Sequence, residues 1–199
     1  MPRRDQSDSA PEETGESSRK KRKERARIAV TSASLGEAAL SYLNRRDASR
    51  AKLVQHLEQW VRRRGTPADP EPARPLILEL ASRYQASGLI NDDRLAKNAL
   101  DSLRARGASS RAIAYKLRAR GVDASVIDAT LAGERQKSQS AELDAARALV
   151  KKKRLGSRRP EADRAANRRR DLAALARAGF DFDTARRALG GNAESDDEF

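Results

Sequence analysis

Residues 91–133 read NDDRLAKNALDSLRARGASSRAIAYKLRARGVDASVIDATLAG and carry the clearest structural pattern in the chain. Three times, a polar residue that can cap a helix is followed by apolar positions three or four apart and then by a glycine. The predicted helices start after Asn91 or Asp92, after Ser109 and after Asp123, and they stop at Gly107, Gly121 and Gly133. No segment alternates apolar and polar residues as a half-buried β-strand does, so we predict consecutive short α-helices.

Helical patterns continue toward the N-terminus. One apolar stripe consists of Ala39, Leu40 and Leu43. Ser49 is a suitable cap for the next helix, whose apolar face consists of Leu53, Leu57, Trp60 and Val61. Four prolines then fall between residues 66 and 75, and we expect a loop there because proline lacks the N–H that a helix interior needs. The following helix carries Leu76, Ile77, Leu80 and Tyr84 and is expected to end at Gly88.

Further helices are predicted on the C-terminal side. A long helix carries Leu143, Ala146, Leu149 and Val150, and a loop at 156–160 ends it. A final pair is predicted at 161–178 and 183–189, with Gly179 between them. Because helices of this length are marginal in isolation, they must pack on one another.

An internal repeat relates several of these helices at a shift of 60 residues. The matching pairs are Leu40 and Leu100, Leu43 and Leu103, Ser49 and Ser109, Leu53 and Ile113, and Leu57 and Leu117. A weaker third copy, at a shift of 72, matches Leu172, Leu175 and Gly179 with Leu100, Leu103 and Gly107. Because stacked units of this kind form extended arrays, we predict an all-α fold of tandem three-helix, helix-turn-helix-like repeats with an elongated, curved body.

This pattern divides the chain into repeats flanked by two tails. Residues 1–34 form a polar tail of mixed charge that we expect to be disordered, and residues 191–199 form an acidic tail. The acidic tail could fold back on the basic surface or have no role. The repeats are predicted at about 35–75, 76–133 and 139–190.

The charge balance favours an anionic partner. The chain has 42 Lys and Arg against 29 Asp and Glu, a formal net charge of +13. Such an excess is typical of proteins that bind nucleic acid, although a basic surface without a specific partner is the alternative. No apolar run approaches the roughly 20 residues that span a bilayer, and no signal peptide is apparent. We therefore expect a cytoplasmic protein without a membrane partner.

Several kinds of chemistry are disfavoured. The absence of cysteine excludes disulfides and thiolate metal sites, and the single histidine, His56, argues against a catalytic triad or a His-rich metal site. Asp92 and Asp93 stand where a helix begins, so we interpret them as capping residues rather than metal ligands. No glycine-rich phosphate loop is present. We expect no cofactor and no enzymatic activity.

The basic helix ends are the candidate contact residues. They are Arg45, Arg46, Arg50, Arg104, Arg106, Arg111, Lys116, Arg118 and Arg120. Arginine binds carboxylates and phosphates through its planar fork, but the same residues could only compensate helix dipoles. The clusters 19–23, 151–154 and 168–170 are basic as well. The first could hold a phosphate backbone or be a solvated tail, and a solvated helix face is the default for the others. Trp60 is expected in the core, and His56 is assigned no chemistry.

Four strings of the sequence resemble the RecX family. They are ALSYLNRRDASR at 39–50, LINDDRLA at 89–96, RG at 106–107 followed by Ile113, Leu117, Arg120-Gly121-Val122 and Ile127, and LARAGF at 175–180. The similarity covers roughly residues 35–189 and lies in the order and spacing of these strings. The sequence departs from the family pattern at three places. The family usually has an aromatic residue where Leu95 stands and a Glu near the position of Lys52. The basic turn that the family has before Gly179 is reduced here to Arg177-Ala178.

The resemblance implies a function that the periodicity itself does not show. RecX proteins modulate RecA, with roles in homologous recombination, DNA repair and the SOS response. They bind the RecA–single-stranded DNA filament, commonly inhibiting its ATP hydrolysis and strand exchange, and their tandem repeats are thought to lie along the filament groove. The implied partners are thus the RecA filament and single-stranded DNA, with double-stranded DNA left open. We expect a monomer.

A second hypothesis fits the same sequence. A basic, all-helical protein could coat or bend DNA independently of RecA, since helix-turn-helix corners also occur in DNA-binding proteins. The direction of regulation, the face that meets the filament and the role of the tails are not determined by the sequence.

Overall fold

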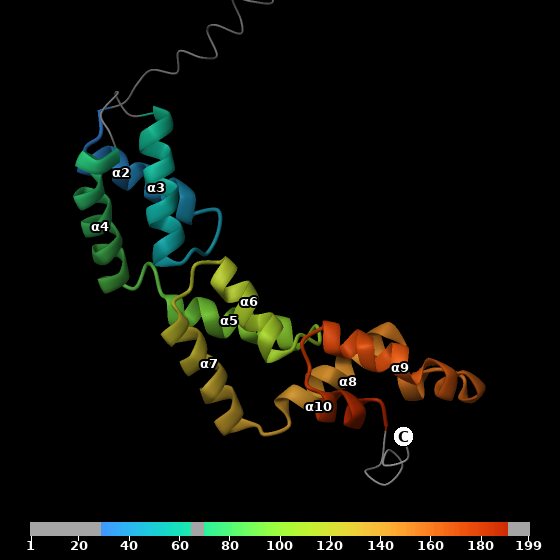
Figure 1. Ribbon diagram of the computed structural model, residues 1–199. Coiled ribbons are helices and arrows are strands. Elements are labelled where there is room, and N and C mark those ends of the chain that lie inside the picture. Colours follow the sequence, from blue (N-terminus) through green and yellow to red (C-terminus); the bar gives the residue numbers. More distant parts are fainter. Residues whose placement is uncertain (1–28, 65–69, 191–199) are drawn as a thin grey trace, which may run out of the picture.

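The computed structural model describes residues 29–64 and 70–190, and within these ranges it contains helices and no strand. The α-helices are α2 (Ser32–Leu43), α3 (Arg50–Arg64), α4 (Pro70–Ala86), α5 (Asp92–Arg104), α6 (Ser110–Ala119), α7 (Ala124–Lys137), α8 (Ala141–Lys153), α9 (Glu161–Arg177) and α10 (Phe182–Ala188), with a short 3-10 helix, η1 (Gly156–Arg158), before α9. Figure 1 shows them as three successive groups along a bent path.

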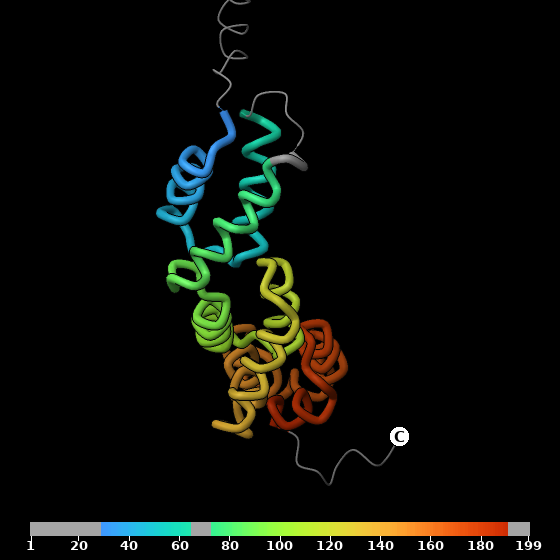
Figure 2. Tube along the Cα trace, turned by 90° about the vertical axis from the view of Figure 1, so that its left-hand side faces the viewer, coloured from blue at the N-terminus to red at the C-terminus, as the bar shows by residue number. Residues whose placement is uncertain are grey.

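Each group of three helices has its own apolar core. Unit one (α2–α4) buries Leu35, Leu53, Leu57 and Ile77, unit two (α5–α7) buries Leu100, Ile113, Leu117 and Ile127, and unit three (α8–α10) buries Leu149, Leu175, Phe180 and Leu189. The units follow one another along an elongated, curved body, as the two perpendicular views show (Figures 1 and 2). The predicted fold of tandem three-helix repeats is confirmed.

The boundary between the first two units differs from the predicted one at 75/76. Helix α4 packs with unit one, because Ile77 and Leu80 lie in the same core cluster as Leu53 and Leu57. The cluster ends at Ile90, so the boundary falls in the short link before α5. The repeat at a shift of 60 could not reveal this, because it matched only the first two helices of each unit.

Unit one also begins earlier than predicted. Helix α2 starts at Ser32, and the Thr31 hydroxyl accepts a hydrogen bond from the Ser34 N–H while the Ser34 hydroxyl accepts one from the Thr31 N–H. This capping box fixes the start of the helix, so residues 31–34 are ordered and not part of a disordered tail. Residues 1–28 and 191–199, which are the remainder of the two predicted tails, and residues 65–69, which include part of the expected proline loop, lie outside the described residues.

Three local predictions are wrong. Helix α4 begins at Pro70 and contains Pro75, whose ring is on the exposed side. Gly133 does not end α7, which continues to Lys137 because nothing there requires a positive φ. Leu40 is 45% exposed, whereas its repeat partner Leu100 is buried; Leu35 and Ala39 form the core face of α2 instead.

The third copy also has a different register from the one predicted. The corner between α9 and α10 joins the second and third helices of unit three, so by position it corresponds to the corner between α6 and α7, at a shift of 58 rather than 72. Gly121 and Gly179 both have positive φ, at 74° and 93°, and the buried residues Val122 and Phe180 follow them. Asp123 and Asp181 then cap the next helix in each copy.

Candidate functional site

A polar joint connects units one and two. The buried Ser49 hydroxyl caps α3 by accepting from the Lys52 N–H at 3.2 Å, and it donates to the carbonyl of Arg120, the C-cap of α6, at 2.7 Å. The Arg50 N–H donates to the Asp92 carboxylate at 3.0 Å. In the first turn of α3, the Lys52 N–H is thus satisfied by the helix's own cap, Ser49, and the Arg50 N–H by Asp92 of the neighbouring unit. The bonds of Ser49 and Asp92 across the joint fix how the two units meet.

The same joint recurs between units two and three. Ser109 caps α6 by accepting from the Ala112 N–H, and it donates to the Ala178 carbonyl at 2.6 Å. Here Glu142 takes the role of Asp92 and accepts from the Ser110 N–H at 3.1 Å. The two joints therefore place equivalent residues at regular intervals along the body.

Arg104 belongs to the second joint and not to a contact surface. Its guanidinium pairs with Glu134 at 2.6 Å and with Glu142 at 2.7 Å, and it also donates to Ser110 and to the Ala108 carbonyl. The side chain is 12% exposed. The carboxylates raise the pKa of Arg104 against the opposing effect of its burial. Because its donors are occupied, Arg104 is left out of the contact residues proposed below.

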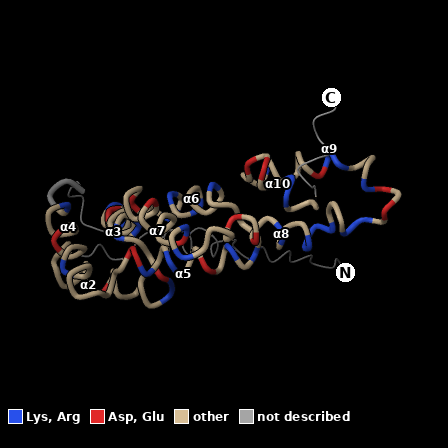
Figure 3. The backbone as a smooth tube through the Cα atoms, turned by 90° about the horizontal axis from the view of Figure 1, so that it is seen from below, with Lys and Arg blue, Asp and Glu red and all other residues tan. Residues whose placement is uncertain are grey.

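The other predicted contact residues lie at the surface. Arg45, Arg46, Arg106, Arg111, Lys116, Arg118 and Arg120 are exposed, and Arg50 is half-buried. Arg45 donates to the Ser41 hydroxyl at 3.2 Å, and Arg50 donates to the Ser82 hydroxyl at 3.4 Å. Figure 3 shows Lys and Arg along the whole length of the body, with acidic residues among them. Most of these cations are therefore spread over the surface, and they do not all form one cluster.

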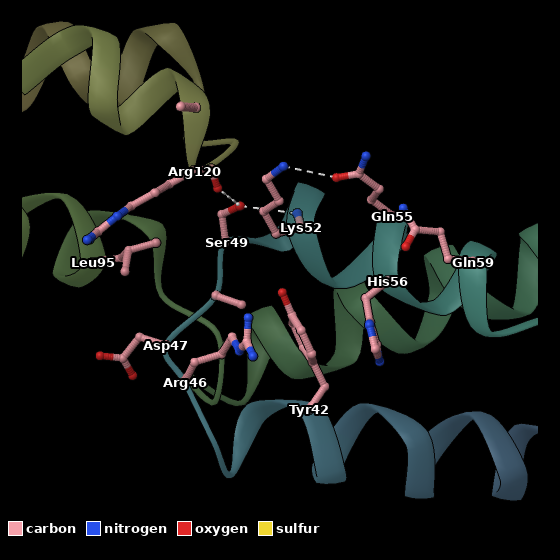
Figure 4. Close-up of a pocket in the computed structure, with 12 residues that line it drawn as sticks. Tyr42, Arg46, Asp47, Ser49, Lys52, Gln55, His56, Gln59, Leu95 and Arg120 are labelled. Carbon is pink, nitrogen blue, oxygen red and sulfur yellow. Dashed lines mark hydrogen bonds between the residues drawn. The ribbon is translucent and has the colours of Figure 1, made fainter.

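Two of the predicted residues, Arg46 and Arg120, come together in a groove beside the first joint. This groove, of about 710 Å³, is lined by Tyr42, Arg46, Asp47, Ala48, Ser49, Lys52, Gln55, His56, Gln59, Leu95, Ala119 and Arg120 (Figure 4). We call it the joint groove. It draws residues from both units, from the α2–α3 turn, α3 and the end of α6. Lys52, Gln55 and Gln59 were not among the predicted site residues, because they belong to no charge run or motif.

An aromatic stack forms one side of the joint groove. The rings of Tyr42 and His56 are stacked with centroids 4.0 Å apart and planes 14° from parallel. The Arg46 guanidinium lies 5.4 Å from the centre of the Tyr42 ring, so Tyr42 stands between Arg46 and His56 (Figure 4). Partial burial lowers the pKa of His56, and the nearby positive charges of Arg46, Arg63 and Arg45 lower it further. A bound anion would act in the opposite direction.

Asp92 and Asp93 lie on the other side of the first joint. Asn91, not Asp92, caps α5 by accepting a hydrogen bond from the Arg94 N–H at 2.8 Å. The Asp92 carboxylate instead accepts from the first turn of the neighbouring helix α3. Burial raises the pKa of Asp92, and the Arg50 N–H partly opposes this rise. Among the described residues, no cluster of three or more His, Cys, Asp or Glu is arranged to hold a metal ion.

Comparison with known proteins finds similarity to a family model, to a curated protein and to a solved structure. Residues 91–131 match the family model of the second three-helix domain of RecX. The chain is 40% identical over 161 residues to the regulatory protein RecX of Myxococcus xanthus (strain DK1622), covering 79% of this chain and 85% of that protein. The fold is similar to the crystal structure of RecX from Lactobacillus salivarius, with a TM-score of 0.62 and 17% identity, over 79% of this chain and 94% of that one.

These matches agree with the architecture described above. The family model falls on unit two, the unit flanked by both joints. The Myxococcus relative extends the likeness over most of the chain. Within residues 29–64 and 70–190, no helix combines the length and the apolar character needed to cross a membrane. The chain therefore belongs to the RecX family of regulatory proteins.

Proposed function

We propose that this protein regulates RecA by binding along the RecA–single-stranded DNA filament, and that it lowers the ATP hydrolysis and strand exchange of the filament. Membership of the RecX family, carried by the 40% identity to a regulatory protein, is the observation that supports this most directly. In this proposal the chain acts in the cytoplasm as a monomer, needs no cofactor, and changes ATP turnover only through its partner.

The shape and charge of the body support binding to a repeating partner. Arg46 and Arg106 occupy equivalent positions in units one and two, each in the turn before the helix that starts at a joint. Neither has an ion-pair partner within 4 Å among the described residues. Two exposed arginines at equivalent positions can contact two acidic groups or phosphates that repeat at the same spacing.

The first test is a titration of RecA ATP hydrolysis on single-stranded DNA. We expect the rate to fall at well below one molecule of this protein per RecA protomer. The double variant Arg46→Glu/Arg106→Glu should require a several-fold higher concentration for the same effect. A matched control, Lys152→Glu/Arg169→Glu, changes two exposed charges in unit three and should behave like the unchanged chain. An unchanged ATPase rate at stoichiometric concentrations would refute the proposal.

The net charge of +13 favours a second candidate, a protein that coats or bends duplex DNA independently of RecA. Pure phosphate binding weakens steeply with salt, with a log–log slope of about −0.9 per duplex phosphate contacted. Binding to a filament with an apolar contribution should weaken less. Steep, RecA-independent duplex binding without any effect on ATP hydrolysis would favour this candidate.

A further inference from the structure

The joint groove carries positive charge that the fold itself does not neutralise. Arg46, Lys52 and Arg120 line it, and none has a carboxylate within ion-pair distance among residues 29–64 and 70–190. Asp47 is the one carboxylate among the lining residues. With His56 neutral, three cations and one anion leave a net charge of +2. An uncompensated charge of this sign in a concave site attracts an anionic ligand.

The cations come from different parts of the groove. Arg46 belongs to the turn after α2, Lys52 to the first turn of α3, and Arg120 to the end of α6 in the neighbouring unit (Figure 4). The Arg120 carbonyl is held by Ser49 at 2.7 Å, so the position of this residue relative to α3 is fixed by the joint. Because the three cations come from separate elements, they suit a ligand with several negative charges better than a single small anion.

The remaining lining groups favour a nucleic acid over an acidic peptide. Gln55 and Gln59 follow Lys52 along α3 and provide amide donors and acceptors; Gln55 accepts from Lys52 Nζ at 3.0 Å. His56 and Arg46 cover the two faces of the Tyr42 ring, so the stack contributes ring edges and the face of His56 that is turned away from Tyr42. Amides and aromatic rings suit the edges and faces of unpaired bases, which a duplex does not expose. The backbone of an acidic peptide can also bond to the two amides, but a chain of carboxylates has no flat group to place against the His56 ring.

We propose that the joint groove binds a single strand of nucleic acid, with Arg46, Lys52 and Arg120 contacting phosphates and Gln55 and Gln59 contacting base edges. This proposal assigns a ligand to one site of the proposed RecA regulator. It rests on the proposed function only for the role of the groove in the filament. The groove exists only where two units meet, so binding the strand also couples unit one to unit two.

His56 provides a direct test, because it is the only histidine in the chain. Its single ring-proton signal can be followed by NMR through a pH titration of the full-length protein. An oligothymidylate of about 12 nucleotides, within the usual site size for single strands, should raise the pKa of His56, because bound phosphates favour the protonated ring. An unchanged pKa at saturating oligonucleotide overturns the proposal.

Two further ligands decide between classes of partner. A polyglutamate peptide and a short duplex, each of the same charge as the oligothymidylate, should raise the pKa of His56 much less. If polyglutamate has the larger effect, the groove holds an acidic protein segment and the proposal is wrong. An equal or larger effect of the duplex would also contradict it.

Charge-removing variants test the phosphate contacts. In the anisotropy of a labelled oligothymidylate, Lys52→Gln/Arg120→Gln should weaken binding by roughly 10- to 30-fold at 0.1 M salt and reduce the log–log salt slope by about 1.4, since each single-strand phosphate contact contributes about 0.7. The control Lys152→Gln/Arg169→Gln should leave the slope nearly unchanged. If both variant pairs weaken oligonucleotide binding equally, the overall positive charge of the protein and not the groove holds the oligonucleotide, and the proposal is overturned.

Folding of the variants is checked by helical circular dichroism and by the fluorescence of Trp60, which lies one turn after His56 on α3. RecA ATP hydrolysis is measured separately. If the groove variants lose oligonucleotide binding and the unchanged chain has no effect on RecA, the groove proposal stands while the proposed function fails. If the unchanged chain lowers RecA ATP hydrolysis but the groove variants keep their oligonucleotide binding, the proposed function stands and the groove proposal fails.

Discussion

Gly179 lies where unit three contacts unit two. A Cβ atom on this residue would be 2.6 Å from the Ser109 hydroxyl oxygen and 3.2 Å from the Arg111 Cβ, and its φ is 93°. We therefore expect Gly179→Ala to lower the free energy of unfolding by roughly 2–4 kcal/mol, combining backbone strain with the loss of the joint. Chemical denaturation followed by circular dichroism measures this change.

Substitutions at two other glycines distinguish the cost of backbone strain from the cost of steric crowding. Gly88 has a φ of 74° but nothing within 4 Å of its Cβ position, so Gly88→Ala should cost about 1 kcal/mol from the backbone alone. Gly133 is helical with open space around it, and Gly133→Ala should stabilise α7 by about 0.5–1 kcal/mol. If Gly179→Ala cost no more than Gly88→Ala, the closeness of the two units would not matter for stability.

Asp171 is a buried acid with a defined structural partner. Its side chain is 1% exposed, and it accepts two hydrogen bonds from Arg159 and one from the Gly156 N–H, all at 2.8 Å. The hydrogen bonds from Arg159 lower the pKa of Asp171 despite its burial. Asp171 lies in α9, whereas Gly156 and Arg159 lie in the segment between α8 and α9, so these bonds anchor that segment to α9.

The lowered pKa gives Asp171 a predictable pH dependence. Its contribution is fully present above the unfolded pKa of about 3.9 and is lost as the pH falls through the lower folded value. Asp171→Asn should cost roughly 2–4 kcal/mol at neutral pH, because it leaves Arg159 without its carboxylate. Between about pH 5 and pH 2, the stability of this variant should fall less steeply than that of the unchanged chain. Parallel curves would show that Asp171 does not titrate with unfolding.

Local sequence signals predicted most helices, because the start and the end of each helix depend mainly on residues of that helix. Ser109 and Asp123 cap α6 and α7 as expected, and Gly107 and Gly121 follow α5 and α6 with positive φ. The errors arise where tertiary packing overrides a local signal. Helix α4 tolerates Pro75 because its opposite side buries Ile77 and Leu80 against unit one.

Pro75 is therefore predicted to weaken the element that contains it. It cannot donate a backbone hydrogen bond to the preceding turn of α4, and its ring is exposed, so replacing it removes no core packing. Pro75→Ala should stabilise the protein by roughly 1–2 kcal/mol, after allowing for the more flexible unfolded chain. Pro160→Ala, at the boundary before α9, should be neutral or slightly destabilising in the same denaturation assay. A loss of stability in Pro75→Ala would contradict this account.

The candidate site was less predictable than the helices. Basic helix ends could be found because charge and capping patterns are local, and they led to Arg46 and Arg120. Their meeting in one groove depends on the contact between Ser49 and Arg120, which are 71 residues apart. The repeat at a shift of 60 paired Ser49 with Ser109 but could not show that both serines reach into the next unit.

At the scale of the molecule, residues 29–64 and 70–190 form a row of three cores connected by two equivalent joints. Such arrays gain stability from each unit and from each interface between neighbours. The joints consist of polar contacts at helix ends, and the core clusters of the units are separate. Loosening one joint should therefore affect the units beside it more than the distant one.

Serine substitutions at the two joints test this arrangement. Ser109→Ala removes the cap of α6 and the bond to Ala178, and it should cost about 1–2 kcal/mol. By hydrogen exchange, amides of α8–α10 should then exchange roughly 5- to 30-fold faster, while α2–α4 stay protected. Ser49→Ala should give the mirror image, with faster exchange in α2–α4 and little change in α8–α10. Uniform acceleration along the chain in both variants would show instead that the three units unfold as one.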